Sequence, residues 1–104
     1  MPADLRHGAA IEACFAVEAT YAPDAATKRA PHREAHLTRL AMLSDEGALV
    51  LGGAFEDLSA SLLVLAVGSE DAARAIVETD VYWRHKVWTS YTVRKLNRVL
   101  FEDA

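Results

Sequence analysis

One stretch decides the fold: IEACFAVEATY, residues 11–21. Its odd-numbered positions are all apolar or aromatic, whereas both of its acids and its threonine fall on even positions. An alternation with a period of two is typical of a strand with one well-buried face. The residues before it show no period, so we expect residues 1–10 to form a flexible tail and residues 11–104 to form a single domain.

The segment after this strand predicts one principal helix. Residues 22–30 contain a proline turn and then meet Pro31, so we expect a loop or a short helical turn there. The helix begins at Pro31 or His32, because proline suits the first helical position, and it runs to Glu46. Gly47 suits the left-handed conformation that follows a helix end.

Two short strands come next. Residues 48–51 form an apolar strand that Gly52 and Gly53 close, and residues 54–59 connect it to the following strand. Residues 60–67 are almost wholly apolar, which is typical of a strand buried on both sides.

A second helix and a last strand complete the chain. Ser69 caps a helix that ends near Asp80, residues 81–87 fit a short helical turn or a loop, and residues 89–100 alternate loosely as a strand. This order predicts a two-layer α+β sandwich of four strands with both helices on one face. The other face is partly apolar, and its simplest cover is a second copy, so we expect a symmetric homodimer.

Composition excludes several classes of protein. The 104-residue chain is 52% hydrophobic with a formal net charge of −4, which argues against a nucleic-acid partner because such proteins present a basic face. No apolar run is long enough for a signal peptide or a membrane span. The single cysteine, Cys14, permits no intrachain disulfide. We therefore expect a cytoplasmic protein in which Cys14 is a buried small hydrophobe.

One histidine is expected to face inward on the principal helix. His36 shares a stripe with Leu40 and Leu43, so its ring lies at the edge of the apolar face. A histidine there needs a polar partner, and its charge changes near neutral pH. Asp80, at the end of the second helix, is the candidate partner. Our hypothesis is that the two side chains meet in the folded protein.

Two roles are open for this pair. A carboxylate on one ring nitrogen fixes the tautomer of His36, so the other nitrogen takes or delivers a proton near pH 7. The alternative is a structural hydrogen bond that ties the helix to a loop. Arg33, one turn earlier, either binds a substrate carboxylate with its planar fork or is a solvated partner of Glu34 or Asp24.

Four aromatic residues either line a pocket near the pair or belong to the core or an interface: Phe55, Tyr82, Trp83 and Trp88. Tyr82 is the substrate-binding candidate, since it follows Asp80 closely and has a polar tip. His32 and His36 are four positions apart, but no third ligand accompanies them, so we expect no metal and no cofactor.

Three segments resemble the YciI-like (YCII-related) family. Residues 33–37 (REAHL) resemble its R-x-x-H-L stretch, residues 47–53 (GALVLGG) its G-x-L-x-x-x-G strand, and residues 80–82 (DVY) its D-P-[YF] segment. The resemblance spans residues 11–100. It implies a ferredoxin-like βαββαβ sandwich with a four-stranded antiparallel sheet, assembled as a dimeric α+β barrel with a cleft.

The resemblance also implies a His–Asp pair, which maps onto His36 and Asp80. A related dehydrochlorinase that acts on a chlorinated hydroxymuconate implies that the scaffold hosts lyase chemistry. Val81 stands where the family has proline, which loosens the constraint on Asp80. We predict a cofactor-free enzyme of lyase or isomerase type that acts on a small organic acid. In this prediction His36 and Asp80 are catalytic, and Arg33 and Tyr82 bind the substrate. The alternative is a non-enzymatic, dimeric ligand-binding or accessory module.

Overall fold

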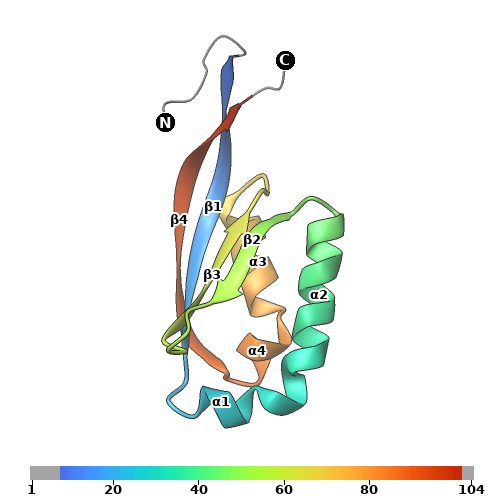
Figure 1. Cartoon of the computed structure of the whole chain (residues 1–104), viewed down its shortest axis with the longest axis vertical. Coiled ribbons are helices and arrows are strands. Elements are labelled where there is room, and N and C mark those ends of the chain that lie inside the picture. Colours follow the sequence, from blue (N-terminus) through green and yellow to red (C-terminus); the bar gives the residue numbers. More distant parts are fainter. Residues whose placement is uncertain (1–7, 102–104) are drawn as a thin grey trace.

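Four antiparallel strands form one sheet in the spatial order β2-β3-β1-β4. In the computed structural model, which describes residues 8–101, the strands are β1 (Ala9–Tyr21), β2 (Leu49–Ala54), β3 (Ala60–Leu65) and β4 (Trp88–Phe101). The helices are α1 (Ala25–Lys28), the 3₁₀ turn η2 (Ala30–His32), α2 (Arg33–Asp45), α3 (Glu70–Glu78) and α4 (Val81–Arg84). Figure 1 shows the helices on one side of the sheet. The predicted α+β class and ferredoxin-like topology are confirmed.

The pairing of the strands places the core between the sheet and the helices. Val17 pairs with Leu63 and Phe15 pairs with Leu65, so the odd-numbered residues of β1 share the covered face with alternate residues of β3. The predicted alternation is confirmed over residues 15–21, where every odd position is buried. Full burial of one such side chain contributes about 1.5–3 kcal/mol, so this layer is a main source of stability.

β1 and β4 extend beyond the rest of the sheet as a two-stranded ribbon (Figure 1). Ala9 pairs with Phe101 and Ile11 pairs with Val99, so β1 begins two residues before the predicted start. Ile11 is 65% exposed because no helix reaches this end of the ribbon. The last two residues of the predicted tail therefore belong to the strand, and residues 1–7 lie outside the described residues.

β2 continues through Gly52 and Gly53, which the sequence predicts as its end. Gly52 pairs with Leu63 across the ladder, and a Cβ at Gly52 would lie 3.3 Å from the Leu63 side chain. Close packing within a strand, rather than a turn, therefore accounts for this glycine. As a result, β2 carries no side chains at its fourth and fifth residues, Gly52 and Gly53.

The helix ends follow their sequence signals closely. α2 begins directly after a 3₁₀ turn that contains Pro31, and Gly47 beyond its end has the predicted positive φ, +80°. The Ser69 hydroxyl caps α3 by accepting a hydrogen bond from the Ala72 N–H at 3.1 Å. No helix in the described part of the chain has the length and apolar character needed to cross a membrane.

Candidate active site

The helix that carries the predicted site packs loosely on the sheet. α2 buries one side chain, His36, while Leu40 and Leu43 are half-buried and Leu37 is 47% exposed. α2 contacts the sheet at β2, where glycines leave space between the helix and the strand. A cavity therefore forms beside the one polar residue that the helix buries.

His36 and Asp80 meet in the structure, as the sequence predicts. Nδ1 of His36 lies 2.9 Å and 3.0 Å from the two carboxylate oxygens of Asp80, and the two residues are only 5% and 1% exposed. An ionised carboxylate can only accept hydrogen bonds, so Nδ1 carries the hydrogen. The neutral ring then presents Nε2 as its acceptor.

Two further groups besides His36 donate hydrogen bonds to the carboxylate of Asp80. It is the N-cap of α4 and accepts a hydrogen bond from the Tyr82 N–H at 2.8 Å. Nη1 of Arg39 donates to the same carboxylate at 3.3 Å, and Nη2 of Arg39 donates to the Thr79 hydroxyl at 2.6 Å. The sequence reasoning missed Arg39, although its position three residues after His36 on the same helix is a signal for it.

The backbone at Asp80 has a conformation that is compatible with a proline at the next position. Asp80 is extended, with φ of −73° and ψ of 142°, which is the region that a residue before proline occupies. Val81 is the first residue of α4, a position that proline also suits. The backbone here would therefore also accept proline, and the loosening expected from Val81 stays a prediction.

Two aromatic rings fix the plane of the imidazole. The Tyr82 ring stacks on His36 with centroids 3.8 Å apart and an interplanar angle of 10°. Trp88 meets the His36 ring edge-on, at 5.3 Å and 89°. Burial raises the pKa of Tyr82, the Tyr21 hydroxyl adds to the rise, and two nearby arginines oppose it. The Tyr82 phenol therefore stays neutral at pH 7 and can donate a hydrogen bond.

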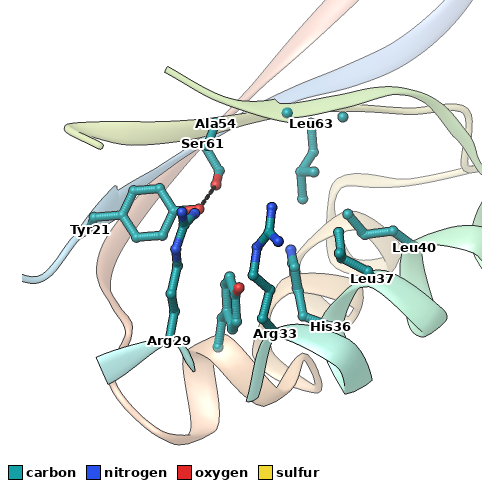
Figure 2. A pocket seen from close by; sticks show the side chains of 12 residues that line it. Tyr21, Arg29, Arg33, His36, Leu37, Leu40, Ala54, Ser61 and Leu63 are labelled. Atoms are coloured by element: carbon teal, nitrogen blue, oxygen red, sulfur yellow. Dashed lines mark hydrogen bonds between the residues drawn. The ribbon is translucent and has the colours of Figure 1, made fainter. Parts of the chain in front are cut away.

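The cavity between α2 and β2 has a volume of about 180 Å³, below the roughly 300–1,000 Å³ typical of drug-sized ligands. Its lining residues are Tyr21, Arg29, Arg33, His36, Leu37, Leu40, Gly52, Gly53, Ala54, Ser61, Leu63 and Tyr82. Figure 2 shows the guanidinium groups of Arg29 and Arg33 inside this space. Within residues 8–101 neither arginine forms an ion pair, so the alternative pairing of Arg33 with Glu34 or Asp24 is absent there.

A buried chain of hydrogen bonds forms the opposite wall. Nε1–H of Trp88 donates to the Ser61 hydroxyl at 3.3 Å, and the Ser61 hydroxyl bonds to the Tyr21 hydroxyl at 2.8 Å (Figure 2). These residues come from β4, β3 and the end of β1. The sequence reasoning did not identify Ser61, Tyr21 or Arg29 as site residues. Strand pairing brings Tyr21 and Ser61 together, and the path of the chain after α1 places Arg29.

The other aromatic candidates lie elsewhere. Phe55 is 45% exposed and does not line this cavity. Trp83 packs edge-on against the Tyr91 ring at 5.1 Å, and Trp88 is buried behind His36. Among the four aromatic residues named from the sequence, Tyr82 alone contributes to the lining.

His32, His85 and Cys14 make contacts of their own outside the pair, and His7 lies outside the described residues. His32 stacks on His85 with centroids 4.0 Å apart. The Cys14 thiol is fully buried and donates to the Leu96 carbonyl oxygen at 3.4 Å, which confirms its interpretation as a small core residue. Over the described range 8–101, no three His, Cys, Asp or Glu side chains gather in a metal-binding arrangement.

Together these features define a small ferredoxin-like α+β protein with a buried His–Asp pair beside a cavity. The sequence profile of the YCII-related domain matches residues 13–97, and the chain belongs to this family. The fold is similar to that of 5-chloro-2-hydroxyhydroquinone dehydrochlorinase from Burkholderia phenoliruptrix AC1100, solved in complex with 2,5-dihydroxybenzoquinone. The two share 21% sequence identity with a TM-score of 0.69, over 78% of this chain and 90% of that chain. No curated protein sequence shows a significant match.

Proposed function

We propose that this protein is a cofactor-free enzyme that uses His36 and Asp80 for acid/base chemistry on a small organic acid. One observation carries the proposal: Nδ1 of His36 is bound by a buried carboxylate, while the ring lines a cavity with Nε2 unbound by any described residue. Such an imidazole can act as a general base through Nε2, and the Asp80 carboxylate stabilises the cation that forms. Arg33 supplies positive charge for the carboxylate of the substrate, and Tyr82 supplies a hydrogen-bond donor.

The chemistry that fits is proton abstraction followed by elimination or isomerisation. Nε2 of His36 takes a proton from a substrate carbon, and the C–H electron pair forms a C=C bond. Either a leaving group on the next carbon departs with its bonding pair, or the next carbon already belongs to a C=C bond whose π pair shifts to the far carbon, which takes the proton back from His36. Both routes balance without an oxidant or reductant. The dehydrochlorinase activity in the name of the structurally similar protein supports the elimination route.

A second candidate is a ligand-binding or accessory module without catalysis. The hydrogen bonds that Asp80 accepts from the Tyr82 N–H and from Arg39 favour it, because they organise α4 and α2 whether or not a substrate is present. In that case the bond to His36 is a structural link between the two helices.

Hydrogen exchange in D₂O tests the catalytic proposal. We expect the protein to exchange or eliminate a C–H hydrogen in at least one member of a panel of small unsaturated, halogenated and hydroxylated acids, followed by ¹H NMR. The matched control is His36→Asn under the same conditions. Equal rates for the two proteins, or no reaction across the panel, would contradict catalysis and favour the binding module.

The face of the sheet opposite the helices supports a proposal of a homodimer. Leu51 pairs with Val64, and Cys14 pairs with Leu96, so these residues lie on the face that the helices do not cover. Leu51 is 55% exposed and Leu96 is 42% exposed. An uncovered apolar face is typical of an interaction surface, and a two-fold pair buries the same face on both copies.

A charge on this face is expected to separate the dimer. Leu62 pairs with Glu18 in the middle of the open face, so Leu62→Asp places two acids side by side at the interface. Sedimentation should then report the 11.3 kDa mass of one chain rather than twice that mass. Met42→Asp, on the 57% exposed surface of α2, is the control and should leave the mass unchanged. A monomeric wild-type protein would refute the dimer.

A further inference from the structure

The lining of the cavity is unusually rich in hydrogen-bond donors and positive charge. Arg29 and Arg33 both line it, and among residues 8–101 the lining contains no aspartate or glutamate. Neither guanidinium group forms a side-chain hydrogen bond within the described part of the chain. Arginine stays charged at any physiological pH. Two permanent positive charges therefore face a small space in which no residue of the range 8–101 supplies a counter-charge.

The two guanidinium groups enter the cavity from different elements. Arg29 follows α1 directly, and Arg33 is the first residue of α2. Figure 2 shows the guanidinium of Arg33 on the side of His36 and that of Arg29 on the side of Tyr21. Both charges reach the Tyr82 hydroxyl, where they favour the ionised form against the effect of burial on its pKa. One guanidinium group therefore lies toward the His36 side of the cavity, and the other lies toward the Tyr21 side.

The hydroxyl wall adds a free donor next to Arg29. The indole of Trp88 can only donate, so its hydrogen occupies one lone pair of the Ser61 oxygen. Ser61 and Tyr21 share one hydrogen bond, which uses one of their two hydroxyl hydrogens. The other hydrogen has no acceptor among the described residues, and both hydroxyl-bearing side chains line the cavity. A ligand oxygen is therefore the natural acceptor at this wall.

We propose that the cavity binds a small dicarboxylate, with one carboxylate on Arg33 beside His36 and the other on Arg29 and the Tyr21 hydroxyl. The inference rests on the proposed function, in which His36 acts on an organic acid, and it adds a second acidic group at a defined place. A carboxylate matches the planar fork of arginine and accepts a hydroxyl hydrogen at the same time. The volume of about 180 Å³ corresponds to about six water molecules at ~30 Å³ each, which restricts the ligand to a short chain.

Calorimetric titration with fumarate, maleate and crotonate tests this assignment. The three acids have the same number of carbons, and crotonate lacks the second carboxylate. We expect the better of the two dicarboxylates to bind the wild-type protein roughly 10- to 100-fold more tightly than crotonate, as expected for an added charged hydrogen bond. Dimethyl fumarate, which is neutral, should not bind measurably.

Variants of Arg29 and Tyr21 test whether the second carboxylate of the ligand binds to these two residues. Arg29→Gln should remove the preference for the dicarboxylate and leave crotonate affinity within about twofold. Tyr21→Phe keeps the ring and removes the hydroxyl, so it should weaken dicarboxylate binding several-fold in the same direction. Arg74→Gln, on the exposed surface of α3, is the charge-matched control. Arg29→Lys serves as a second variant that keeps the charge without the fork, and circular dichroism confirms that each variant is folded.

The outcomes separate this inference from the catalytic proposal. Equal affinities for crotonate and both dicarboxylates, or an unchanged preference in Arg29→Gln, would overturn the second subsite. His36→Asn should still prefer the dicarboxylate, because binding at Arg29 requires no proton transfer. A preference for dicarboxylates without hydrogen exchange in D₂O would support the subsite and refute catalysis.

Discussion

Replacing Asp80 with alanine is expected to lower the free energy of unfolding by about 3–5 kcal/mol, because it leaves several donors around the carboxylate without an acceptor and removes a helix cap. Asp80 is 1% exposed and accepts hydrogen bonds from His36, Arg39 and the Tyr82 N–H. Alanine leaves all three donors without this acceptor and removes the cap of α4. Because domains of this size are stable by only about 5–15 kcal/mol, such a loss is a large share of the total.

Urea denaturation of the wild-type protein and of Asp80→Ala measures this loss of stability. Asp80→Asn is the matched variant, since its amide oxygen still accepts from the Tyr82 N–H while its charge is gone. We expect a smaller loss for Asp80→Asn than for Asp80→Ala, with unchanged m-values in both. A loss below about 1 kcal/mol for Asp80→Ala would show that the carboxylate is not the junction of α2 and α4 that its contacts indicate.

Replacing His36 with asparagine is expected to lower turnover of a productive substrate by roughly 10²–10⁴-fold, the usual contribution of a general acid or base. The asparagine amide nitrogen takes the approximate place of Nδ1, so the bond to Asp80 can persist. The nitrogen that faces the cavity has no equivalent in asparagine. The free energy of unfolding should therefore fall by no more than about 1–2 kcal/mol.

The contrast between turnover and stability makes this variant informative. A folded His36→Asn protein with lost turnover supports a catalytic imidazole. A protein that loses several kcal/mol of stability together with its binding affinity supports the structural link instead. Steady-state kinetics on the substrate found by hydrogen exchange, combined with urea denaturation of the same preparation, distinguishes these results.

Much of the architecture was predictable from local patterns. The alternation over residues 11–21 predicted the central strand, and Gly47 and Ser69 marked helix ends that the structure confirms. Such signals are local because side-chain periodicity and backbone conformation depend on a few neighbouring residues. The prediction that Gly52 and Gly53 end the strand was wrong, because β2 continues to Ala54. Gly52 is needed for packing against Leu63 and not for a turn.

The residues of the candidate site likewise divide into those with a local signal in the sequence and those placed only by tertiary packing. His36 is conspicuous in the sequence because a polar residue stands on an apolar stripe, and the structure places its Nδ1 2.9 Å from a carboxylate oxygen of Asp80, as the sequence predicts. Their catalytic role stays a prediction. Arg39 had one local signal, its position three residues after His36, but its contacts with Asp80 and Thr79 depend on how α2 packs beside the end of α3.

By itself, the sequence determined the strand and helix order and the two-layer α+β class, because each depends on spacing along single segments. It also pointed to the pair of His36 and Asp80, since a histidine on an apolar stripe needs a partner and the resemblance to the YCII-related family implies which one. Only the tertiary structure decided which residues form the cavity wall. Tyr21 and Ser61 line it from two strands, with Trp88 of a third strand bonded to Ser61 behind them, and strand pairing brings these three side chains within hydrogen-bond distance. The placement of Arg29 opposite this wall depends likewise on the path of the chain between β1 and α2.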